Sequence, residues 1–387
     1  MTEPGQRTIV QVVPYYPPHL GGMENVARTI AEGLAERHEV EVLTTTCGAP
    51  GVPRVERAGN LTVRRLRTVE FAHMPISPGL FGHLLRAPRT AIVHVHVAQA
   101  LTPEIVWLAA VLRRRPFIAH FHLDVDPSGR WGRIFLAVYK RRILGRTLRA
   151  ASRVIVLSDG LARFLVERYR VRPEAIVVAP NGVGPEFRPA SVTATREPGP
   201  CRLLFVGRIA PQKALPRLLH AIALMHEPVD AAIVGDGEDS ASVQNLASEL
   251  ALTNVRFVGT QLGEDLVRWY QWADVFVLPS EKEGGMSLVV MEAMASGLPV
   301  VATDVQGTGE ALAGTGLLTS PDPESLAAAL DRVADDPALR AELAARSLLR
   351  AQEYSWPRLV QRLESLYADV LPSPERAGAT TDGETTS

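Results

Sequence analysis

Lysine, cysteine and long apolar runs are all scarce in this sequence of 387 residues. The two cysteines, Cys47 and Cys201, lie far apart, which argues against a disulfide framework and indicates reduced thiols. No apolar run approaches the roughly 18 residues of a membrane span, and MTEPGQRTIVQVV lacks the features of a signal peptide. We therefore expect a cytoplasmic protein, and the formal net charge of −1 argues against nucleic acid as a partner.

Only three of the 41 basic residues are lysines: Lys140, Lys213 and Lys282. A lysine is therefore not the default surface cation of this chain. Hydrophobic content of 46 % and charged content of 21 % are typical of a globular protein, and the length indicates about two domains.

Strands and helices alternate along the chain in two runs, separated by a polar, proline-rich stretch. This order predicts an α/β protein with two Rossmann-like domains that face each other across a cleft. We expect a first domain over residues 1–187, a linker over 188–200, a second domain over 201–355, an amphipathic helix over 356–371 and a disordered tail over 372–387.

The central motif is SEKEGGMSLVVMEAMASG, between Ser280 and Gly297, which follows the apolar strand ADVFVLP. A glycine loop before a helix offers backbone N–H groups and the positive end of a helix dipole to an anion. Glu283 and Glu292 carry carboxylates, which accept hydrogen bonds from hydroxyls. Amides for a phosphate together with carboxylates for hydroxyls suit a nucleotide sugar.

Two other glycine-containing turns precede helices. In VGRIAPQK, Gly207 allows a close backbone approach, and Arg208 and Lys213 could clamp a diphosphate. Gly21 and Gly22 open the first helix and could present amides to phosphate. The simpler alternatives are surface cations in a solvated loop and an ordinary helix-entry turn.

Histidines occur in pairs at the ends of two predicted strands. Alternation places His120 and His122 on the same side of the sheet. They could be structural, or ligate a metal with Asp124 or Asp126. The preceding strand carries a similar pair, His94 and His96, which we interpret as structural or as lying on the acceptor side.

The sequence EGGMSLVVMEAMA resembles the acidic signature EGFGLVLLEAMA of retaining glycosyltransferases of family 4, which have the GT-B fold. Eight residues rather than seven separate Glu283 from Glu292, so either Glu283 or Gly284 occupies the position of the sugar-binding acid. We favour Glu283 because Pro279 keeps the family's spacing from the strand. FVGR followed by a lysine, GGMEN and NGV are also similar to family motifs, and the resemblance extends from PPHLGGMEN to YSWPRLVQRLESLY.

The resemblance implies a GT-B enzyme with an acceptor-binding first domain, a donor-binding second domain and a final helix that crosses back to the first. It implies sugar transfer from a nucleoside diphosphate sugar, such as UDP-glucose or UDP-N-acetylglucosamine, to a hydroxyl, without a metal or other cofactor. The catalytic residues that it indicates are His122, Arg208, Lys213 and Glu283. The substrate-binding residues are Gly21, Gly22, Asn181, Gly207, Gly285, Met286, Ser287, Leu288, Glu292 and Glu310.

Other interpretations remain open. A nucleotide-sugar epimerase shares the two-domain fold, and a non-catalytic nucleotide-sugar sensor would share the binding residues. A nicotinamide-dependent oxidoreductase is disfavoured, because Gly235-Asp236-Gly237 is only a fragment of the dinucleotide fingerprint. The basic, apolar stretch at 130–153 fits either a core helix with a solvated basic face or a weak peripheral contact with anionic lipid. The sequence leaves the oligomeric state open.

Overall fold

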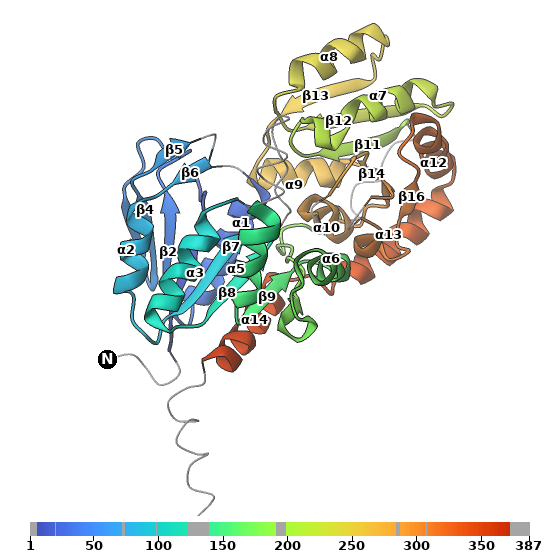
Figure 1. Cartoon of the computed structure of the whole chain (residues 1–387). Helices are drawn as coiled ribbons and strands as arrows, with labels where there is room; N and C mark the ends of the chain where they lie inside the picture. Colours follow the sequence, from blue (N-terminus) through green and yellow to red (C-terminus); the bar gives the residue numbers. More distant parts are fainter. Residues whose placement is uncertain are drawn as a thin grey trace, which may run out of the picture. The chain divides into compact units, whose positions relative to one another are not determined.

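The computed structural model describes residues 6–19, 21–71, 74–97, 99–122, 139–190, 199–283, 287–305 and 308–371. The chain divides into two compact units (Figure 1): Met1–Pro180 with Trp356–Ser387, and Asn181–Ser355. The boundary lies before residue 181 rather than after residue 187, and a bridge between Val183 and Ser355 ties that segment to the second unit. Most of the expected linker and all of the expected tail lie outside the described residues.

The first unit contains a sheet with the strand order β10-β9-β8-β7-β1-β2-β4-β3, in which β3 alone among these strands pairs antiparallel to its neighbour. A separate antiparallel pair joins β5 and β6. The strands are β1 Thr8–Val12, β2 Glu39–Thr45, β3 Val55–Ala58, β4 Leu61–Leu66, β5 Val69–Phe71, β6 Met74–Ile76, β7 Ile92–Val97, β8 Phe117–Phe121, β9 Arg153–Val156 and β10 Ile176–Val178.

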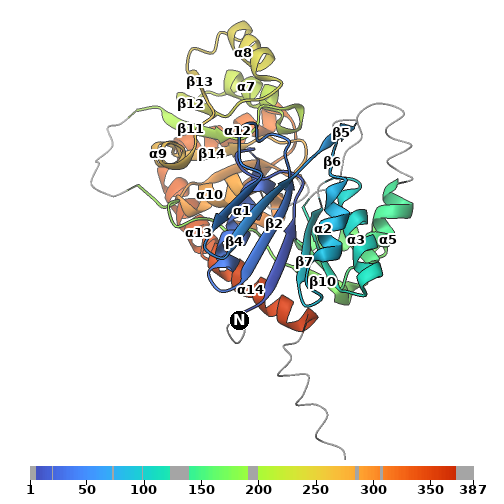
Figure 2. The same cartoon turned by 90° about the vertical axis from the view of Figure 1, so that its left-hand side faces the viewer.

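Helices cover both faces of this sheet: α2, α3 and α5 lie on one side of the strands and α1 and α14 on the other (Figure 2). The helices are α1 Gly22–Ala35, α2 Gly79–Arg86, α3 Thr102–Arg113, η1 Lys140–Leu144, α5 Gly145–Ala150, α6 Asp159–Tyr169, η2 Pro173–Ala175 and α14 Trp356–Val370. Coverage on both faces explains why the central strands β1, β7 and β8 are almost continuously buried, as strands of parallel sheets usually are.

The second unit contains a parallel sheet with the order β13-β12-β11-β14-β15-β16. Its strands are β11 Cys201–Val206, β12 Val229–Val234, β13 Val255–Gly259, β14 Val275–Leu278, β15 Val300–Thr303 and β16 Leu317–Thr319. Its helices are η3 Pro211–Lys213, α7 Leu215–Leu224, α8 Ser240–Glu249, α9 Gly263–Trp272, α10 Leu288–Ala295, α11 Thr308–Leu312, α12 Pro323–Asp335 and α13 Pro337–Ala351.

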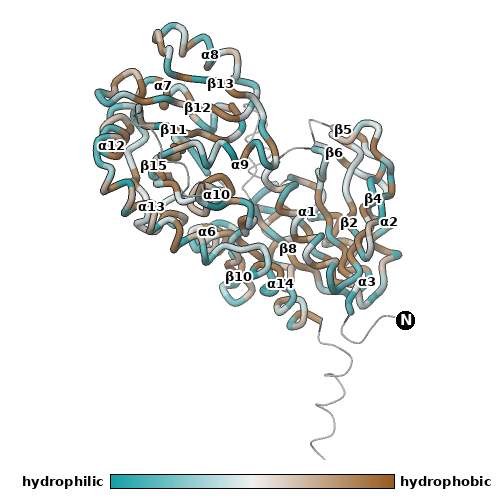
Figure 3. The backbone as a smooth tube through the Cα atoms, turned by 180° about the vertical axis from the view of Figure 1, so that it is seen from behind, coloured by the Kyte–Doolittle hydropathy of each residue, from teal (hydrophilic) through white to brown (hydrophobic). Residues whose placement is uncertain are grey.

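The buried core of the second unit lies between its sheet and its helices, and includes Leu204, Phe276 and Met291. Hydrophobic and hydrophilic residues alternate along the covering helices, as Figure 3 shows for α13. Asp322 and Asp336 cap α12 and α13 by accepting hydrogen bonds from backbone N–H groups three residues ahead. The fold is thus the predicted pair of Rossmann-like units. None of the described helices has the length and apolar character needed to cross a membrane.

The segment between β2 and β7 contains four strands and a helix that the sequence pattern did not predict. β3 has two adjacent charged residues at its centre and lies mostly exposed at the sheet edge, while β5 and β6 have only three residues each. Strands this short and polar carry no clear two-residue period.

Helix α14, predicted from its amphipathic pattern over 356–370, packs against α1 within the first unit. Contact is close at Gly33, where a Cβ atom would lie 2.7 Å from the Val360 Cγ2 atom. Because valine is stiff at χ1, it cannot easily turn away.

We expect Gly33→Ala to lower the free energy of unfolding by about 1–3 kcal/mol, because overpacking outweighs the helix propensity that alanine adds. Gly79→Ala, also in a helix but with open space around the added Cβ, is the control and should be neutral or stabilising. Urea unfolding monitored by circular dichroism compares the two. Stabilisation by both changes would show that α1 and α14 do not pack this closely.

Candidate active site

Two loops at the carboxyl edge of the second unit's sheet are joined by hydrogen bonds. One connects β11 to α7, and the other connects β14 to α10. Glu281 N donates to the Gln212 carbonyl over 2.9 Å, and Gln212 Nε2 donates to the Lys282 carbonyl over 2.8 Å. Arg217, on α7, donates to the Pro279 carbonyl over 2.6 Å and also pairs with Glu281. The predicted cationic loop and the predicted acidic loop therefore form one continuous structure.

An ion pair between two predicted catalytic residues lies at the centre of this structure. Lys213 Nζ is 2.6 Å from Glu283 Oε1, and Ser280 Oγ donates to the same oxygen over 2.6 Å. Ser280 is itself fixed, since Thr303 Oγ1 donates to its carbonyl. Glu283 is only 7 % exposed. Its carboxylate is therefore held inside the loop structure and largely shielded from solvent.

The glycines on this edge have a packing function. A Cβ at Gly235 would lie 1.9 Å from the Gly207 carbonyl oxygen, and one at Gly237 would lie 2.3 Å from the Ile209 carbonyl oxygen. Gly235-Asp236-Gly237 thus allows the turns after β11 and β12 to touch through their backbones, which explains the motif without a dinucleotide. Gly207 has φ +155, and Arg208, which follows it, is exposed to solvent.

Glu292, on α10, has a different environment. Tyr270 donates its hydroxyl to Glu292 Oε2 over 2.7 Å. Burial raises the pKa of Glu292 to about 7, the charge of Glu186 adds to the rise, and the hydrogen bond from Tyr270 opposes it. The carboxyl group therefore changes charge near neutral pH.

The remaining predicted residues of the second unit lie in several places. Ser287 precedes α10 and Leu288 begins it, whereas Gly285 and Met286 lie outside the described residues. Asn181 is 5 % exposed, and its Oδ1 atom has no hydrogen-bond partner among the described residues. Glu310 lies in the short helix α11, and its carbonyl accepts a hydrogen bond from Arg350.

In the first unit, the four histidines form one buried cluster on one face of β7 and β8. His96 Nδ1 lies 2.7 Å from His122 Nε2, and His94 Nε2 lies 3.3 Å from His120 Nδ1. His94 Nδ1 also lies 2.6 Å from the hydroxyl of Tyr367 on α14. Alternation correctly placed His120 and His122 on one side, but the pairing with the other strand was not predicted.

The histidine cluster is the group of described residues best arranged to hold a metal. One nitrogen each from His94, His96 and His120 lie within 4.8 Å of one another. A tetrahedral metal with bonds of about 2.0–2.1 Å would need ligand atoms roughly 3.3 Å apart. His94 Nε2 and His120 Nδ1 already form a hydrogen bond of 3.3 Å, between rings inclined by 25°. Asp124 and Asp126, the other predicted ligands, lie outside the described residues.

At the start of α1, a carboxylate occupies the place predicted for phosphate. A Cβ at Gly21 would lie 2.2 Å from Glu24 Oε2, so the Glu24 carboxylate lies directly against the backbone at the start of the helix. Glu24 is buried and lies 3.1 Å from His19. For the amides of Gly21 and Gly22 to bind a phosphate, Glu24 would have to move away.

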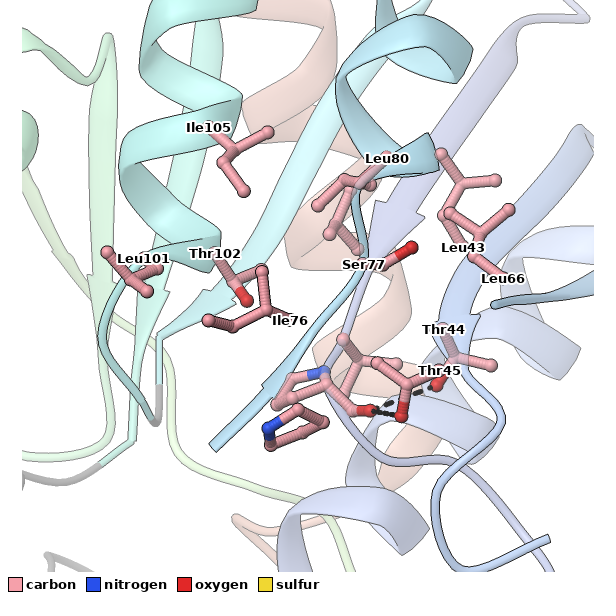
Figure 4. A pocket seen from close by; sticks show the side chains of 14 residues that line it. Leu43, Thr44, Thr45, Leu66, Ile76, Ser77, Leu80, Leu101, Thr102 and Ile105 are labelled. Carbon is pink, nitrogen blue, oxygen red and sulfur yellow. Dashed lines mark hydrogen bonds between the residues drawn. The ribbon is translucent and has the colours of Figure 1, made fainter. Parts of the chain in front are cut away.

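A small cavity of about 10 Å³, enough for one water, lies beyond the carboxyl ends of β1 and β2 (Figure 4). Aliphatic side chains dominate its lining, and the hydroxyls of Thr44 and Thr45 donate to the Pro14 carbonyl beside it. Leu101, also on its wall, has φ +76, an uncommon value for a branched residue.

Two family models match this chain. Residues 20–187 match "Glycosyltransferase Family 4", and residues 200–336 match "Glycosyl transferases group 1". The chain is 31 % identical to D-inositol 3-phosphate glycosyltransferase of Saccharomonospora viridis, covering 91 % of this chain and 90 % of that one. It is 37 % identical to the protein of the same name from Thermomonospora curvata, covering 90 % of each.

Solved structures share the fold. Sucrose-phosphate synthase from Thermosynechococcus elongatus superposes with a TM-score of 0.75 at 23 % identity, covering 97 % of this chain and 100 % of that one. Anabaena HepE in complex with UDP and glucose gives a TM-score of 0.74 at 20 % identity, covering 94 % of this chain and 100 % of that one.

The pKa of Glu292 predicts a pH-dependent affinity. Glu292 is a predicted substrate-binding residue, and its carboxylate accepts hydrogen bonds from hydroxyls better than the carboxylic acid does. With a pKa of about 7, the charged fraction rises about 10-fold between pH 6 and pH 8. We expect UDP-glucose, whose diphosphate does not titrate in this range, to bind up to about 10-fold more tightly at pH 8.

Calorimetry at a series of pH values measures this dependence. Glu292→Gln is the matched control, because it keeps the size of the side chain and removes the titrating group, and its affinity should be weaker and flat with pH. A wild-type affinity that is equally flat between pH 6 and pH 8 would contradict the assignment.

Proposed function

Since the chain belongs to glycosyltransferase family 4 and has the GT-B fold of enzymes that use nucleotide sugars, we propose that it transfers a sugar from a UDP-sugar with retention of the α configuration. UDP-glucose and UDP-N-acetylglucosamine are the proposed donors. The acceptor is a hydroxyl group of a small molecule or a glycan. The first unit binds the acceptor and the second unit binds the donor.

The observation that carries this proposal is the fixed position of Lys213. Its ammonium group is held 2.6 Å from Glu283, on a loop that hydrogen bonds tie to the following loop. When the bond from the sugar to the β-phosphate breaks, negative charge develops on the phosphate. A cation that is already in place stabilises this charge without reorganisation in the transition state. Arg208, exposed at the turn after β11, supplies a second cation.

The two glutamates bind different parts of the donor. Lys213 and Ser280 both hold Glu283 through Oε1, which leaves Oε2 to accept from a hydroxyl of the transferred sugar. Tyr270 holds Glu292 through Oε2, which leaves Oε1 for a ribose hydroxyl. Backbone amides at Ser287 and Leu288 face the phosphates, with Gly285 and Met286 in the same loop.

The reaction needs no metal and no separate base in this proposal. Lys213 and Arg208 supply the positive charge that a divalent cation supplies in other enzymes. The acceptor hydroxyl attacks the anomeric carbon from the side that the diphosphate leaves. As the bond to the phosphate breaks, the departing phosphate oxygen takes the acceptor's proton, so that the products are the glycoside and the nucleoside diphosphate.

The relatives suggest where to look for the acceptor. D-Inositol 3-phosphate glycosyltransferases are 31 % and 37 % identical to this chain, so D-inositol 3-phosphate belongs in the acceptor panel beside uncharged alcohols and glycans. Each donor is incubated with each acceptor and with none, and products are identified by mass spectrometry. A glycoside formed only with an acceptor supports the proposal. An epimerised sugar formed from donor alone would instead identify an epimerase, and binding without any product would identify a sensor.

Replacement of the fixed cation tests the mechanism. We expect Lys213→Ala to lower kcat about 100- to 1000-fold, the magnitude typical of the loss of one preorganised electrostatic partner. Lys282→Ala is the matched control, because Lys282 lies one residue before Glu283 in the same loop, and it should stay within a few-fold of wild type. Near-normal turnover by a folded Lys213→Ala variant would remove Lys213 from the diphosphate site.

The absence of a metal requirement gives a separate prediction. We expect dialysis against EDTA to leave the initial rate unchanged, because two protein cations serve the diphosphate. Rates are compared before and after dialysis, and after addition of Mg²⁺ or Mn²⁺. Complete loss of activity that either ion restores would contradict this mechanism.

A further inference from the structure

The hydrogen bond between His96 and His122 carries an inference about how His122 is prepared for its substrate. His122 is the last described residue before the segment 123–138, directly after β8. His96 lies in β7, directly opposite His120 in the register of the two parallel strands. The two rings are inclined by only 14°, and Nδ1 of His96 lies 2.7 Å from Nε2 of His122. The ring centroids are 5.0 Å apart, about as far as this nitrogen–nitrogen distance allows, so the rings lie edge to edge. The bond is therefore nearly in the plane of both rings, the geometry in which an imidazole donates or accepts.

Each of these rings carries one proton at neutral pH. Burial lowers the pKa of His122 to about 3, and burial together with the neighbouring histidines lowers the pKa of His96 well below its usual value. A neutral imidazole has one N–H donor and one nitrogen lone pair. Whichever ring donates in this bond therefore fixes the position of both protons.

The other nitrogen of His96 decides between the two arrangements. His96 is fully buried, and its Nε2 atom has no hydrogen-bond partner among the described residues. A proton on Nε2 would bury an N–H group that has no acceptor among the described residues. A lone pair at that position leaves only an acceptor unsatisfied. In proteins, buried donors without a partner are rarer than buried acceptors without one. His96 should therefore carry its proton on Nδ1 and donate it to His122.

We propose that His96 is a positioning residue that fixes His122 in the Nδ1–H tautomer. Since Nε2 of His122 accepts from His96, Nδ1 is the nitrogen left for a ligand, and there it presents a donor rather than a base. In the proposed glycosyl transfer, on which this role rests, His122 then donates a hydrogen bond to an oxygen of the bound substrate. It cannot remove the acceptor's proton, which agrees with a reaction that needs no separate base.

The tautomer of His122 can be measured directly by NMR, and the measurement does not depend on enzyme activity. The protein is labelled with ¹⁵N-histidine, and long-range proton–nitrogen correlation spectra are recorded with and without UDP-glucose. The His122 signals are assigned by their loss in His122→Gln. We expect the pattern of a neutral ring protonated on Nδ1 in both spectra. A proton on Nε2 of His122 would overturn the proposal, whether or not the enzyme transfers sugar.

Two substitutions of His96 separate positioning from mere packing. The amide nitrogen of asparagine reaches the place of imidazole Nδ1, whereas that of glutamine reaches the place of Nε2. We expect His96→Gln to lower kcat about 10-fold, the upper range for one neutral hydrogen bond, and His96→Asn to stay within about 3-fold of wild type. The Kd of UDP should not change in either variant.

His94→Gln is the matched control, because His94 lies on the same strand and face but pairs with Tyr367 and His120. It should keep wild-type kcat. Equal turnover in His96→Asn and His96→Gln would overturn the positioning role. If the wild-type protein transfers no sugar to any acceptor, the proposed function fails, while the tautomer measurement still tests the bond between His96 and His122.

Discussion

The ion pair between Lys213 and Glu283 organises the carboxyl edge of the second unit's sheet. A lysine at the end of a short 3₁₀ turn and a glutamate 70 positions later meet at 2.6 Å, because β11 and β14 are neighbours in a parallel sheet and their carboxyl ends coincide. Both side chains are largely buried, and a buried charge without a partner is costly. Each of the two charges is therefore stabilised by the other. The chain thus holds a cation in a fixed position before any ligand arrives, which is the condition for electrostatic stabilisation of a leaving diphosphate.

The first unit also holds polar side chains in fixed positions before a ligand binds, but these side chains are uncharged. One face of its sheet is apolar and packs in a core that includes Val95 and Phe121. The opposite face of β7 and β8 carries imidazoles that bond to each other and to Tyr367 on α14. Because burial keeps these rings uncharged, they can be packed in the interior without counterions. Hydrogen bonds link Tyr367 of α14 to His94 and His94 to His120, and a separate hydrogen bond joins His96 to His122, directly after β8.

The long strands and helices, the two-unit architecture and the final helix were all predictable from hydrophobic periodicity. The edge strands between β2 and β7 were not, because they are short and polar. Residue types at the site were also predictable, but their partners were not. Lys213 and Glu283 were each assigned to a ligand, yet they bind each other. Their loops meet because β11 and β14 are neighbours in the sheet, and the sequence alone does not show which strands are neighbours. Likewise, nothing in the spacing of Glu24 from Gly21 indicated that the carboxylate would fold back onto the helix start.

A double-mutant cycle on Lys213 and Glu283 tests most directly whether the two residues contribute to turnover as a coupled pair. Turnover is measured for Lys213→Ala, Glu283→Gln and the combined variant, with folding checked by circular dichroism. Because Glu283 holds Lys213 in place, the double variant should lose much less turnover than the product of the two single losses, since residues that act as a unit give strongly non-additive effects. Losses that multiply in the double variant would show that the two side chains contribute independently and that their ion pair is incidental to catalysis.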